Sequence, residues 1–458
     1  MKYIHYIGLL GFCLPSFLLA QNTGFSASPG SEIKGAPTGN SSGWIEPFKY
    51  IGNAEKAPEE NAPKRAPALQ KIVDLNAAGD YHAAGTEGLA LMATQSVDEE
   101  LQLIIANSLA WTGRVKQAVP AYQGLSKGKF ANAANVGMAN INSWRGRHDL
   151  ALPLYQTVLA NDPTNADALE GFDLASRELS PRTTWGVMGS SDSSELKRTM
   201  ATLNHRWRDD SGANIFEVEI AGMKDWLPTA MANQQEVTLR YQSLDLALKP
   251  SLELNMPTKL NRSLYATGRV KFFDEQLTVG AGRVNWGKMS VNPIASINDL
   301  SAIYLGANAT QSFALGSVQG RIDYYGVSDG NSIISHSLNF NSAWRPLGSN
   351  FKPFAGIEGR SASASAKTYW SPVNGSGTAY AGILAEWGAA EWNLFGSAQL
   401  GLPLYGDAGN SWSVSAGGKH WLTSDIALNV NLWSMASWRE NSAYRAQSAN
   451  VSLEKLWR

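Results

Sequence analysis

The sequence predicts an α + β multidomain chain, in which a short N-terminal α-solenoid is followed by a transmembrane antiparallel β-barrel of about 16 strands. Three observations lead to this prediction: a helical repeat, alternation of apolar and polar residues from Trp185 onward, and the location of 13 of the 16 tryptophans in that second half. The 458 residues are enough for two or three domains. With 38 basic and 39 acidic side chains, the composition gives no electrostatic reason to expect a nucleic-acid partner.

Residues 1–20 have the layout of a secretory signal peptide. A basic start is followed by an apolar run (7–19), and the small residue Ala20 stands at the expected cleavage position. A run of ~13 apolar residues is too short to remain as a membrane-spanning helix. Cys13 is the single cysteine, which excludes a disulfide framework, a cysteine-based zinc site and an iron–sulfur cluster. Lipidation of Cys13 is the alternative interpretation, although the bulky Phe12 precedes it.

Residues 21–65 are predicted to form a disordered linker. The segment is rich in Gly, Ser, Pro, Asn and Thr, and it has too few apolar residues to bury a core. We expect it to act as a spacer.

Residues 66–180 carry an internal repeat and are rich in helix-forming residues. Four positions recur 33 residues later, which predicts tetratricopeptide repeats with a turn glycine, a small alanine where helices cross and a gap-filling aromatic residue. The repeat-packing residues are Trp111, Gly113, Ala118 and Tyr122, which return as Trp144, Gly146, Ala151 and Tyr155. About three repeats are the minimum for a stable stack. We expect a docking module for protein partners, and a helical spacer without a partner is the alternative.

Residues 185–458 are predicted to form the barrel. Short segments with period-2 alternation are separated by turn clusters, and at ~17 residues per strand the segment gives about 16 strands. Tryptophan favours the membrane–water boundary, and the chain ends on an alternating strand with Trp457 next to last. A soluble β-sandwich is the competing fold, but it would rarely run to 16 strands in one domain.

Function is expected in the lumen of the barrel, where polar residues of the alternating strands point. From Trp185 to Arg458 the sequence has 22 acidic and 23 basic side chains, a balance that argues against a strongly charged permeant. The lumen candidates from alternation are Glu217, Glu219, Glu236, Arg240, Asn429 and Asn431.

Enzyme motifs are not found in the sequence. There is no H-E-x-x-H, G-x-S-x-G or Walker loop, and the histidines after residue 20 have no metal-ligand spacing. Ser335 and His336 are adjacent on a predicted strand, so they face opposite ways and cannot act together as nucleophile and base. The sequence therefore predicts no enzyme, no cofactor and no metal site.

The order of signal peptide, repeats and C-terminal barrel resembles that of outer-membrane exopolysaccharide exporters, of the poly-N-acetylglucosamine and cellulose type. Tyr369-Trp370-Ser371-Pro372 is similar to an aromatic-aromatic-Ser-Pro motif of those barrels. The resemblance implies a 16-stranded pore in the bacterial outer membrane that passes a growing polysaccharide, with the four motif residues Tyr369, Trp370, Ser371 and Pro372 at or near the translocation path.

The same resemblance implies that the repeats lie in the periplasm and hold biosynthesis proteins of the periplasm or inner membrane. The partners would then be the polysaccharide, those proteins and outer-membrane lipid. The family usually has longer repeat arrays than the three units found here. A non-conducting receptor or assembly scaffold is the alternative function, and a lipid- or glycan-modifying enzyme is a third.

Overall fold

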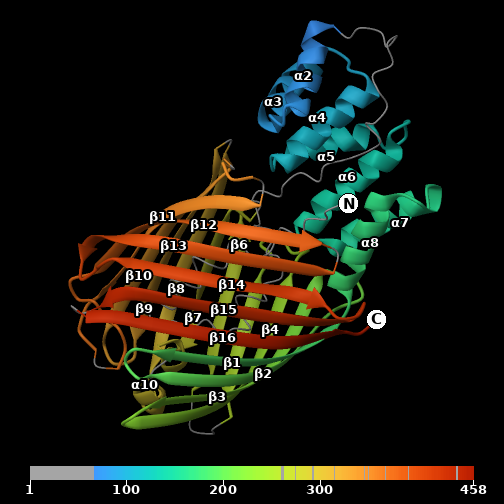
Figure 1. The fold of residues 1–458 in the computed structure, drawn as a ribbon. Helices are drawn as coiled ribbons and strands as arrows, with labels where there is room; N and C mark the ends of the chain where they lie inside the picture. Colours follow the sequence, from blue (N-terminus) through green and yellow to red (C-terminus); the bar gives the residue numbers. More distant parts are fainter. Residues whose placement is uncertain are drawn as a thin grey trace. The chain divides into compact units, whose positions relative to one another are not determined.

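Within the residues that it describes, a computed structural model of the chain has seven helices up to Leu179 and sixteen strands from Arg182 onward (Figure 1). The predicted signal peptide and linker lie outside the described residues. The structure describes residues 66–258, 263–273, 275–290, 293–313, 315–344, 346–348, 350–366, 368–389, 391–439 and 442–458.

The helices form one compact unit, and the strands form a second unit, which is described separately below. Consecutive helices of the first unit pack as antiparallel neighbours joined by short turns. Pro67 begins the first helix, and Asp80 and Asp98 cap the next two by accepting hydrogen bonds from backbone N–H groups three residues on. The helices are α2 (Pro67–Ala77), α3 (Tyr81–Met92), α4 (Glu99–Trp111), α5 (Val115–Gly124), α6 (Ala131–Trp144), α7 (His148–Asn161) and α8 (Ala166–Leu179).

The turns of the helical unit use glycine where the backbone is left-handed. Gly113 follows α4 with φ +75°, and Gly146 follows α6 with φ +70°, so a side chain at either position would be strained. Trp111 and Trp144 end these two helices and are half-buried. The ring of Trp111 lies edge-on to Tyr81, with a centroid distance of 4.8 Å.

Two tyrosines occupy equivalent places in the helical unit. Tyr122 donates a hydrogen bond to the side-chain oxygen of Asn107, and Tyr155 donates one to that of Asn140, each over 2.6 Å. Opposite each ring is a glycine: a Cβ at Gly137 would lie 2.4 Å from the ring of Tyr122.

The same relation holds at Gly171, where a Cβ would lie 2.3 Å from the ring of Tyr155. Ala118 and Ala151 are fully buried where the helices cross. The 33-residue offset seen in the sequence is therefore a repeated contact between an asparagine and a tyrosine, and the glycine opposite the ring recurs after 34 residues. Their assignment to the tetratricopeptide class stays a prediction.

The strands form a closed antiparallel barrel in which each pairs with its sequence neighbours and β1 pairs with β16. The sixteen-strand prediction is confirmed. The strands are β1 (Arg182–Asp192), β2 (Lys197–Arg208), β3 (Asn214–Leu227), β4 (Ala230–Ser243), β5 (Ser251–Pro257), β6 (Tyr265–Phe272), β7 (Leu277–Asn285), β8 (Ser301–Phe313), β9 (Gly316–Val327), β10 (Ser332–Ser342), β11 (Phe351–Ala362), β12 (Ser376–Ala389), β13 (Trp392–Gly406), β14 (Ser411–Trp421), β15 (Ile426–Arg439) and β16 (Ser442–Leu456).

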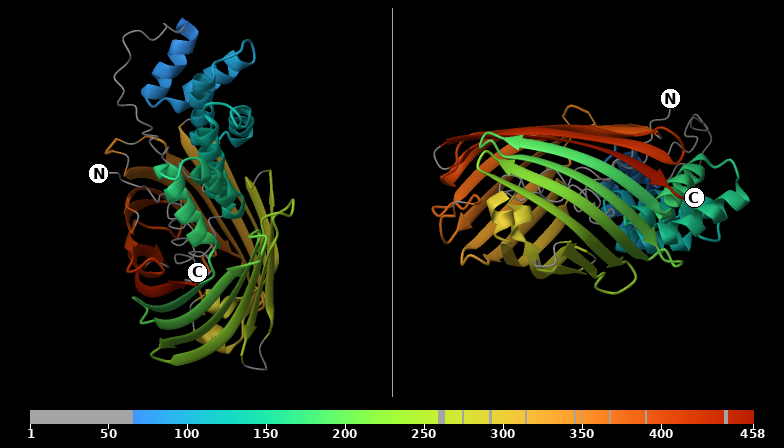
Figure 2. Two further views of the ribbon diagram at one scale, coloured as in Figure 1. Left: turned by 90° about the vertical axis from the view of Figure 1, so that its right-hand side faces the viewer. Right: turned by 90° about the horizontal axis from the view of Figure 1, so that it is seen from below.

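The first strand begins at Arg182, three residues before the predicted start at Trp185. We call the end of the barrel where β1 begins and β16 ends the proximal end, and the opposite end the distal end. Two long connections lie at the distal end, 286–300 and 363–375. The first contains two short helices, α9 (Trp286–Met289) and α10 (Pro293–Ile297), which lie within the ring of strands (Figure 2).

Side chains alternate between two faces of each strand. On β3, Glu217 and Glu219 are buried and face the lumen, whereas Ile220 faces outward with 53% of its surface exposed. The same alternation gives an outward band of exposed Leu, Ile and Val on the other strands. In the described chain, no helix has the length and apolar character needed to cross a membrane.

Candidate functional site

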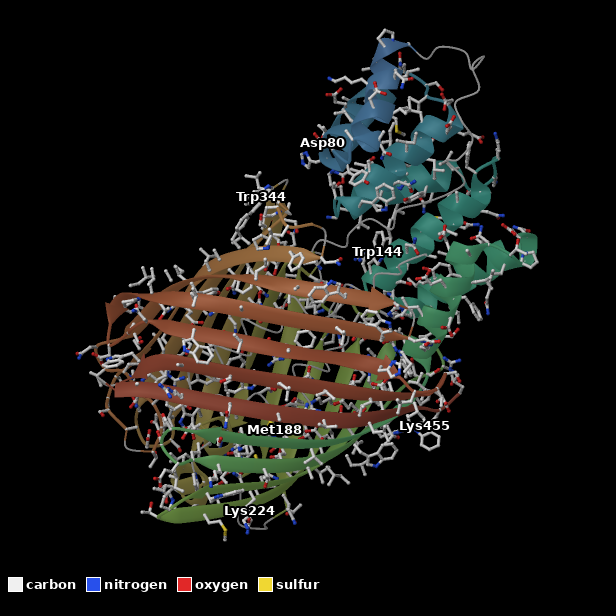
Figure 3. All side chains as sticks on the ribbon, in the orientation of Figure 1. Asp80, Trp144, Met188, Lys224, Trp344 and Lys455 are labelled. Atoms are coloured by element: carbon white, nitrogen blue, oxygen red, sulfur yellow. The ribbon has the colours of Figure 1, made fainter. Side chains whose placement is uncertain are left out.

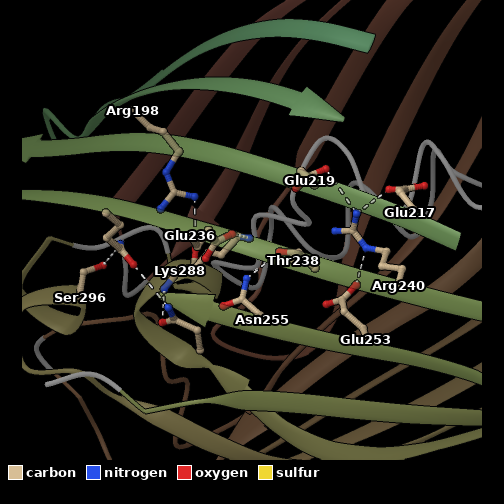
Figure 4. A network of polar contacts seen from close by, with 12 residues as sticks. Arg198, Glu217, Glu219, Glu236, Thr238, Arg240, Glu253, Asn255, Lys288 and Ser296 are labelled. Atoms are coloured by element: carbon tan, nitrogen blue, oxygen red, sulfur yellow. Dashed lines mark hydrogen bonds and ion pairs between the residues drawn. The ribbon is translucent and has the colours of Figure 1, made fainter. Parts of the chain in front are cut away.

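The lumen of the barrel has a charged wall on β2–β5. Arg240 on β4 stands in register between Glu217 on β3 and Glu253 on β5. Its Nη1 lies 2.6 Å from Oε1 of Glu217, and its Nε lies 2.8 Å from Oε2 of Glu253 (Figure 4). Glu219 approaches the same Nη1 at 3.4 Å, and Asn204 donates a hydrogen bond to Glu217 over 2.6 Å.

This arrangement decides what the two glutamates on β3 can do. A paired-carboxylate site needs one carboxyl to hold a proton, and that requires carboxylates without a close cation. Here the guanidinium of Arg240 lies against both Glu217 and Glu219. The group is therefore a compensated ion-pair network of the barrel wall, and the geometry does not favour acid–base chemistry.

A second group of charges lies on the same wall nearer the distal end. Arg198 on β2 and Asp225 on β3 form a bidentate pair, with N–O distances of 2.5 and 2.7 Å, and both side chains are buried. Arg198 also donates to the backbone oxygen of Lys288 over 3.2 Å, and Lys288 pairs with Glu236 on β4. These contacts attach α9 to the lumen face of β2–β4.

A neighbouring hydrogen bond attaches α10 to the same wall. Gln234 on β4 donates to the hydroxyl of Ser296 over 2.7 Å (Figure 4). Because Gln234 and Glu236 are both buried on the lumen face, the described parts of the connection 286–300, which are 286–290 and 293–300, lie inside the barrel. We call this connection the crossing segment.

The other side of the crossing segment packs on β9, β11 and the second distal connection. Trp286 is 1% exposed, and its ring centroid lies 5.3 Å from that of Tyr325 on β9 and 5.3 Å from that of Tyr369. Arg360 on β11 lies between two indoles, with its Cζ 5.8 Å from the ring of Trp286 and 5.5 Å from that of Trp370. The crossing segment therefore contacts two opposite walls, β2–β4 and β9–β11.

The predicted Tyr-Trp-Ser-Pro motif belongs to this distal cluster. Tyr369 donates a hydrogen bond to Asp329 over 2.7 Å, and burial raises the pKa of Tyr369 above its ordinary value. Ser371 accepts a hydrogen bond from the N–H of Ala366 over 2.6 Å, and both Ser371 and Pro372 are buried. The motif thus shapes the distal loop, with Trp370 against Arg360.

The wall formed by β13–β16 is mainly polar, and near its proximal end Lys419 on β14 pairs with Glu454 on β16 over 2.8 Å. Asn431 on β15 stands opposite Asn450 on β16, and Asn429 stands opposite Ser452. Both predicted asparagines are half-buried on the lumen face. The other inward side chains of this neutral wall include Ser397, Gln399, Ser413, Ser415, Trp433 and Ser448.

The structure brings some of the predicted residues together and separates others. Glu217, Glu219 and Arg240 form one network, whereas Glu236 belongs to the attachment of α9. Asn429 and Asn431 lie on the neutral wall, and the motif lies at the distal end. Sequence reasoning missed Arg198, Asp225, Trp286, Lys288 and Arg360. Arg198 and Asp225 could have been found, because they continue the inward parity of β2 and β3.

Ser335 and His336 lie on opposite faces of β10. Ser335 is buried on the lumen side, and His336 faces outward, where its Nε2 lies 3.2 Å from the hydroxyl of Tyr405. Among the described residues, no group of three or more His, Cys, Asp or Glu side chains could hold a metal ion.

No protein-family model and no curated protein matches the sequence. Among solved structures, the barrel is similar to one described as a bacterial polysaccharide outer membrane secretin. The TM-score is 0.51 and the identity 11%, over 61% of this chain and 99% of that chain. CdiB from Acinetobacter baumannii matches with a TM-score of 0.37 and 10% identity, over 60% of each chain. OccK11 from Pseudomonas aeruginosa matches with a TM-score of 0.34 and 10% identity, over 61% of this chain and 96% of that chain. The first likeness is one of fold, a closed barrel that accounts for nearly all of the chain compared.

Proposed function

We propose that this chain is an outer-membrane β-barrel that exports a neutral or weakly charged exopolysaccharide, cellulose-like or poly-N-acetylglucosamine-like, from the periplasm to the cell surface. The helical repeats would dock biosynthesis proteins of the periplasm or inner membrane. The observation that carries the proposal is the lumen itself, which combines a wall of amides and hydroxyls on β13–β16 with a wall of mutually compensated charges on β2–β5.

Location in a membrane is supported by the outward face of the strands. Outward side chains such as Val187, Leu338 and Leu400 are 63%, 47% and 72% exposed, which is costly in water and favourable in lipid. All described strands pair into a closed ring, so the barrel has no open edge that a bilayer would leave unsatisfied.

A polysaccharide as substrate is supported by the chemistry of the neutral wall. Serine hydroxyls and asparagine and glutamine amides both donate and accept hydrogen bonds, as sugar hydroxyls do. Exchange of hydrogen bonds between sugar hydroxyls and these groups costs little free energy, so a neutral polysaccharide can move along the wall. The likeness in fold to a protein described as a polysaccharide secretin points to the same substrate class.

The first test is deletion of the gene, followed by measurement of polysaccharide in the medium and in the periplasm. We expect the polymer to disappear from the medium and to accumulate in the periplasm. An unchanged distribution would contradict the proposal.

A sharper test places a large side chain in the lumen. Asn431→Trp should obstruct the neutral wall and reduce secreted polymer, whereas Val430→Trp, one residue earlier and facing outward, should not. Equal export by both variants would exclude this wall from the path.

The alternative function, a non-conducting receptor or scaffold, is favoured by the crossing segment. Its contacts with two walls, from Lys288 to Glu236 and from Trp286 to Tyr325, narrow the distal end. Purified protein in a planar bilayer separates the two functions: an exporter should conduct ions, at least transiently, and a receptor should not.

A further inference from the structure

The outward face of the barrel has an unusual distribution of charge. Every charged side chain that the strand register places outward is a cation, and no carboxylate lies on the outward face of the described strands. All strand carboxylates face the lumen or the strand ends. The outward cations are Lys197, Lys224, Arg283, Arg445 and Lys455.

Three of these cations lie on neighbouring strands near the distal end. Lys197 is on β2, Lys224 on β3 and Arg445 on β16, with only β1 between β16 and β2. Trp226 is the partner of Lys197, and Lys224 is two residues from it, so the two lysines form a diagonal pair with a separation of ~7–8 Å. All three side chains are exposed, and we call them the distal cationic patch.

The three cations also lie at one height on the barrel. Gln447, Ser191 and Lys197 share one ladder level, Arg445 lies two residues to the distal side of it, and Lys224 lies two residues to the proximal side. Tilted strands at a spacing of ~4.8 Å shift residues of equal height by about one residue per strand. From Arg445 on β16 to Lys224 on β3 the position shifts by four residues over three strand steps. This shift is close to the one that the strand tilt produces, so the three cations lie at about the same height on the barrel.

The surroundings of the patch match a boundary between headgroups and lipid. Toward the middle of the barrel, the same strands expose Val187, Leu203 and Ile220. The amine of Lys224 lies 5.7 Å from the ring of Trp226, an aromatic residue at the level expected for an interfacial belt. Figure 3 labels Lys224 and Lys455, which lie toward opposite ends of the barrel wall.

The carboxylates nearest to the patch are engaged elsewhere. Asp225 pairs with Arg198 in the lumen, and Asp192 accepts a hydrogen bond from Tyr444 over 3.0 Å. With Glu195 in the turn between β1 and β2 included, the patch remains net positive.

We propose that the distal cationic patch binds the phosphate groups of a multiply phosphorylated lipid headgroup in the leaflet around the distal end. This inference rests on the proposed location of the barrel in a membrane. The cations are distributed over three strand spacings, ~14 Å in all, which is too wide for one phosphate and fits a headgroup with phosphates at two places. The apolar band beside Leu203 and Ile220 would receive the acyl chains.

The test uses the full chain in a neutral detergent, with native mass spectrometry and diphosphoryl lipid A as the probe. The triple variant K197Q/K224Q/R445Q should bind this lipid about 100-fold more weakly, since each cation near an anionic surface strengthens binding roughly fivefold. The wild-type affinity should fall with added salt. A matched control, K71Q/K127Q/K129Q, removes the same charge from exposed lysines of the helical unit and should bind like the wild type.

Two outcomes would overturn the inference. One is equal binding of lipid A by the patch variant and the wild type, with both shown to be folded by their heat-dependent migration on a gel. The other is equal wild-type affinity for phosphatidylglycerol, which has one phosphate. Loss of polymer export is measured separately, so failure of the export proposal with retained lipid binding, or the reverse, is distinguishable.

Discussion

The charged wall on β2–β5 and the neutral wall on β13–β16 differ in how their inward polar side chains find partners. On β2–β5, polar groups that face inward satisfy one another, as Arg240 does with Glu217 and Glu253. On β13–β16, hydroxyls and amides such as that of Asn431 line the lumen on the distal side of the Lys419–Glu454 pair. The comparison teaches that charge in a lumen is not evidence of a charged permeant. In the proposed exporter, the charged wall would maintain the shape of the barrel, and the neutral wall would be the surface available to a substrate.

Removal of the central cation should have the largest effect. Arg240→Met leaves Glu217, Glu219 and Glu253 without their shared guanidinium, and loss of one partner from a buried pair costs ~3–5 kcal/mol. We expect unfolding at a clearly lower urea concentration, measured by tryptophan fluorescence of the purified protein. An unfolding midpoint equal to that of the wild type would show that the network is not structural.

Release of the crossing segment should have the next largest effect. Glu236→Gln weakens the contact with Lys288, and a hydrogen bond to a charged group is worth ~1.5–3 kcal/mol. We expect more frequent or larger openings in a planar bilayer. The matched control is Glu386→Gln, which breaks the pair with Lys352 in the lumen of β11–β12, and it should leave conductance unchanged. Equal conductance traces for both variants would contradict the assigned role of the crossing segment.

The neutral wall should respond in the opposite sense, with function lost and stability retained. Asn431→Leu removes hydrogen-bonding groups from the lumen but breaks no ion pair, so we expect a stability change within ~0.5 kcal/mol. Secreted polysaccharide should fall, whereas Val430→Leu on the outward face should secrete normally. A large loss of stability in Asn431→Leu would erase the distinction between the walls.

The smallest effect is expected at an ion pair that lies outside both walls and is partly exposed to solvent. In the proximal turn before β15, hydrogen bonds from Lys455 and Thr423 hold the pKa of Asp425 below its usual value of 3.8. Because the pKa of Asp425 is lower in the folded chain than in the unfolded chain, ionised Asp425 stabilises the fold at pH values above its usual pKa. This stabilisation disappears as the pH falls through the lowered pKa. Asp425→Asn should therefore lower the melting temperature slightly at pH 7, and the difference from the wild type should shrink as the pH falls below 3.8.

Alternation in the sequence was sufficient to predict the barrel and the inward position of Glu217, Glu219, Arg240 and Asn431, because parity along a strand determines the face. It could not predict which inward residues meet. The contact of Arg198 with Lys288 joins residues 90 apart and depends on a connection without periodicity. The role of Trp286 was equally hidden, since its neighbours come from strands brought together only by closure of the ring.

Closure itself has a consequence for how the chain folds. Trp457 donates a hydrogen bond to Thr183 across 274 residues, and β1 pairs with β16 along eleven positions from Arg182 to Asp192. The helices can form from local contacts as soon as they are synthesised, but the edge of β1 that faces β16 stays unpaired until β16 is present. A chain without β16 would therefore have unpaired strand edges that can pair with other chains. Truncation of the last strand should produce aggregation and not a smaller barrel.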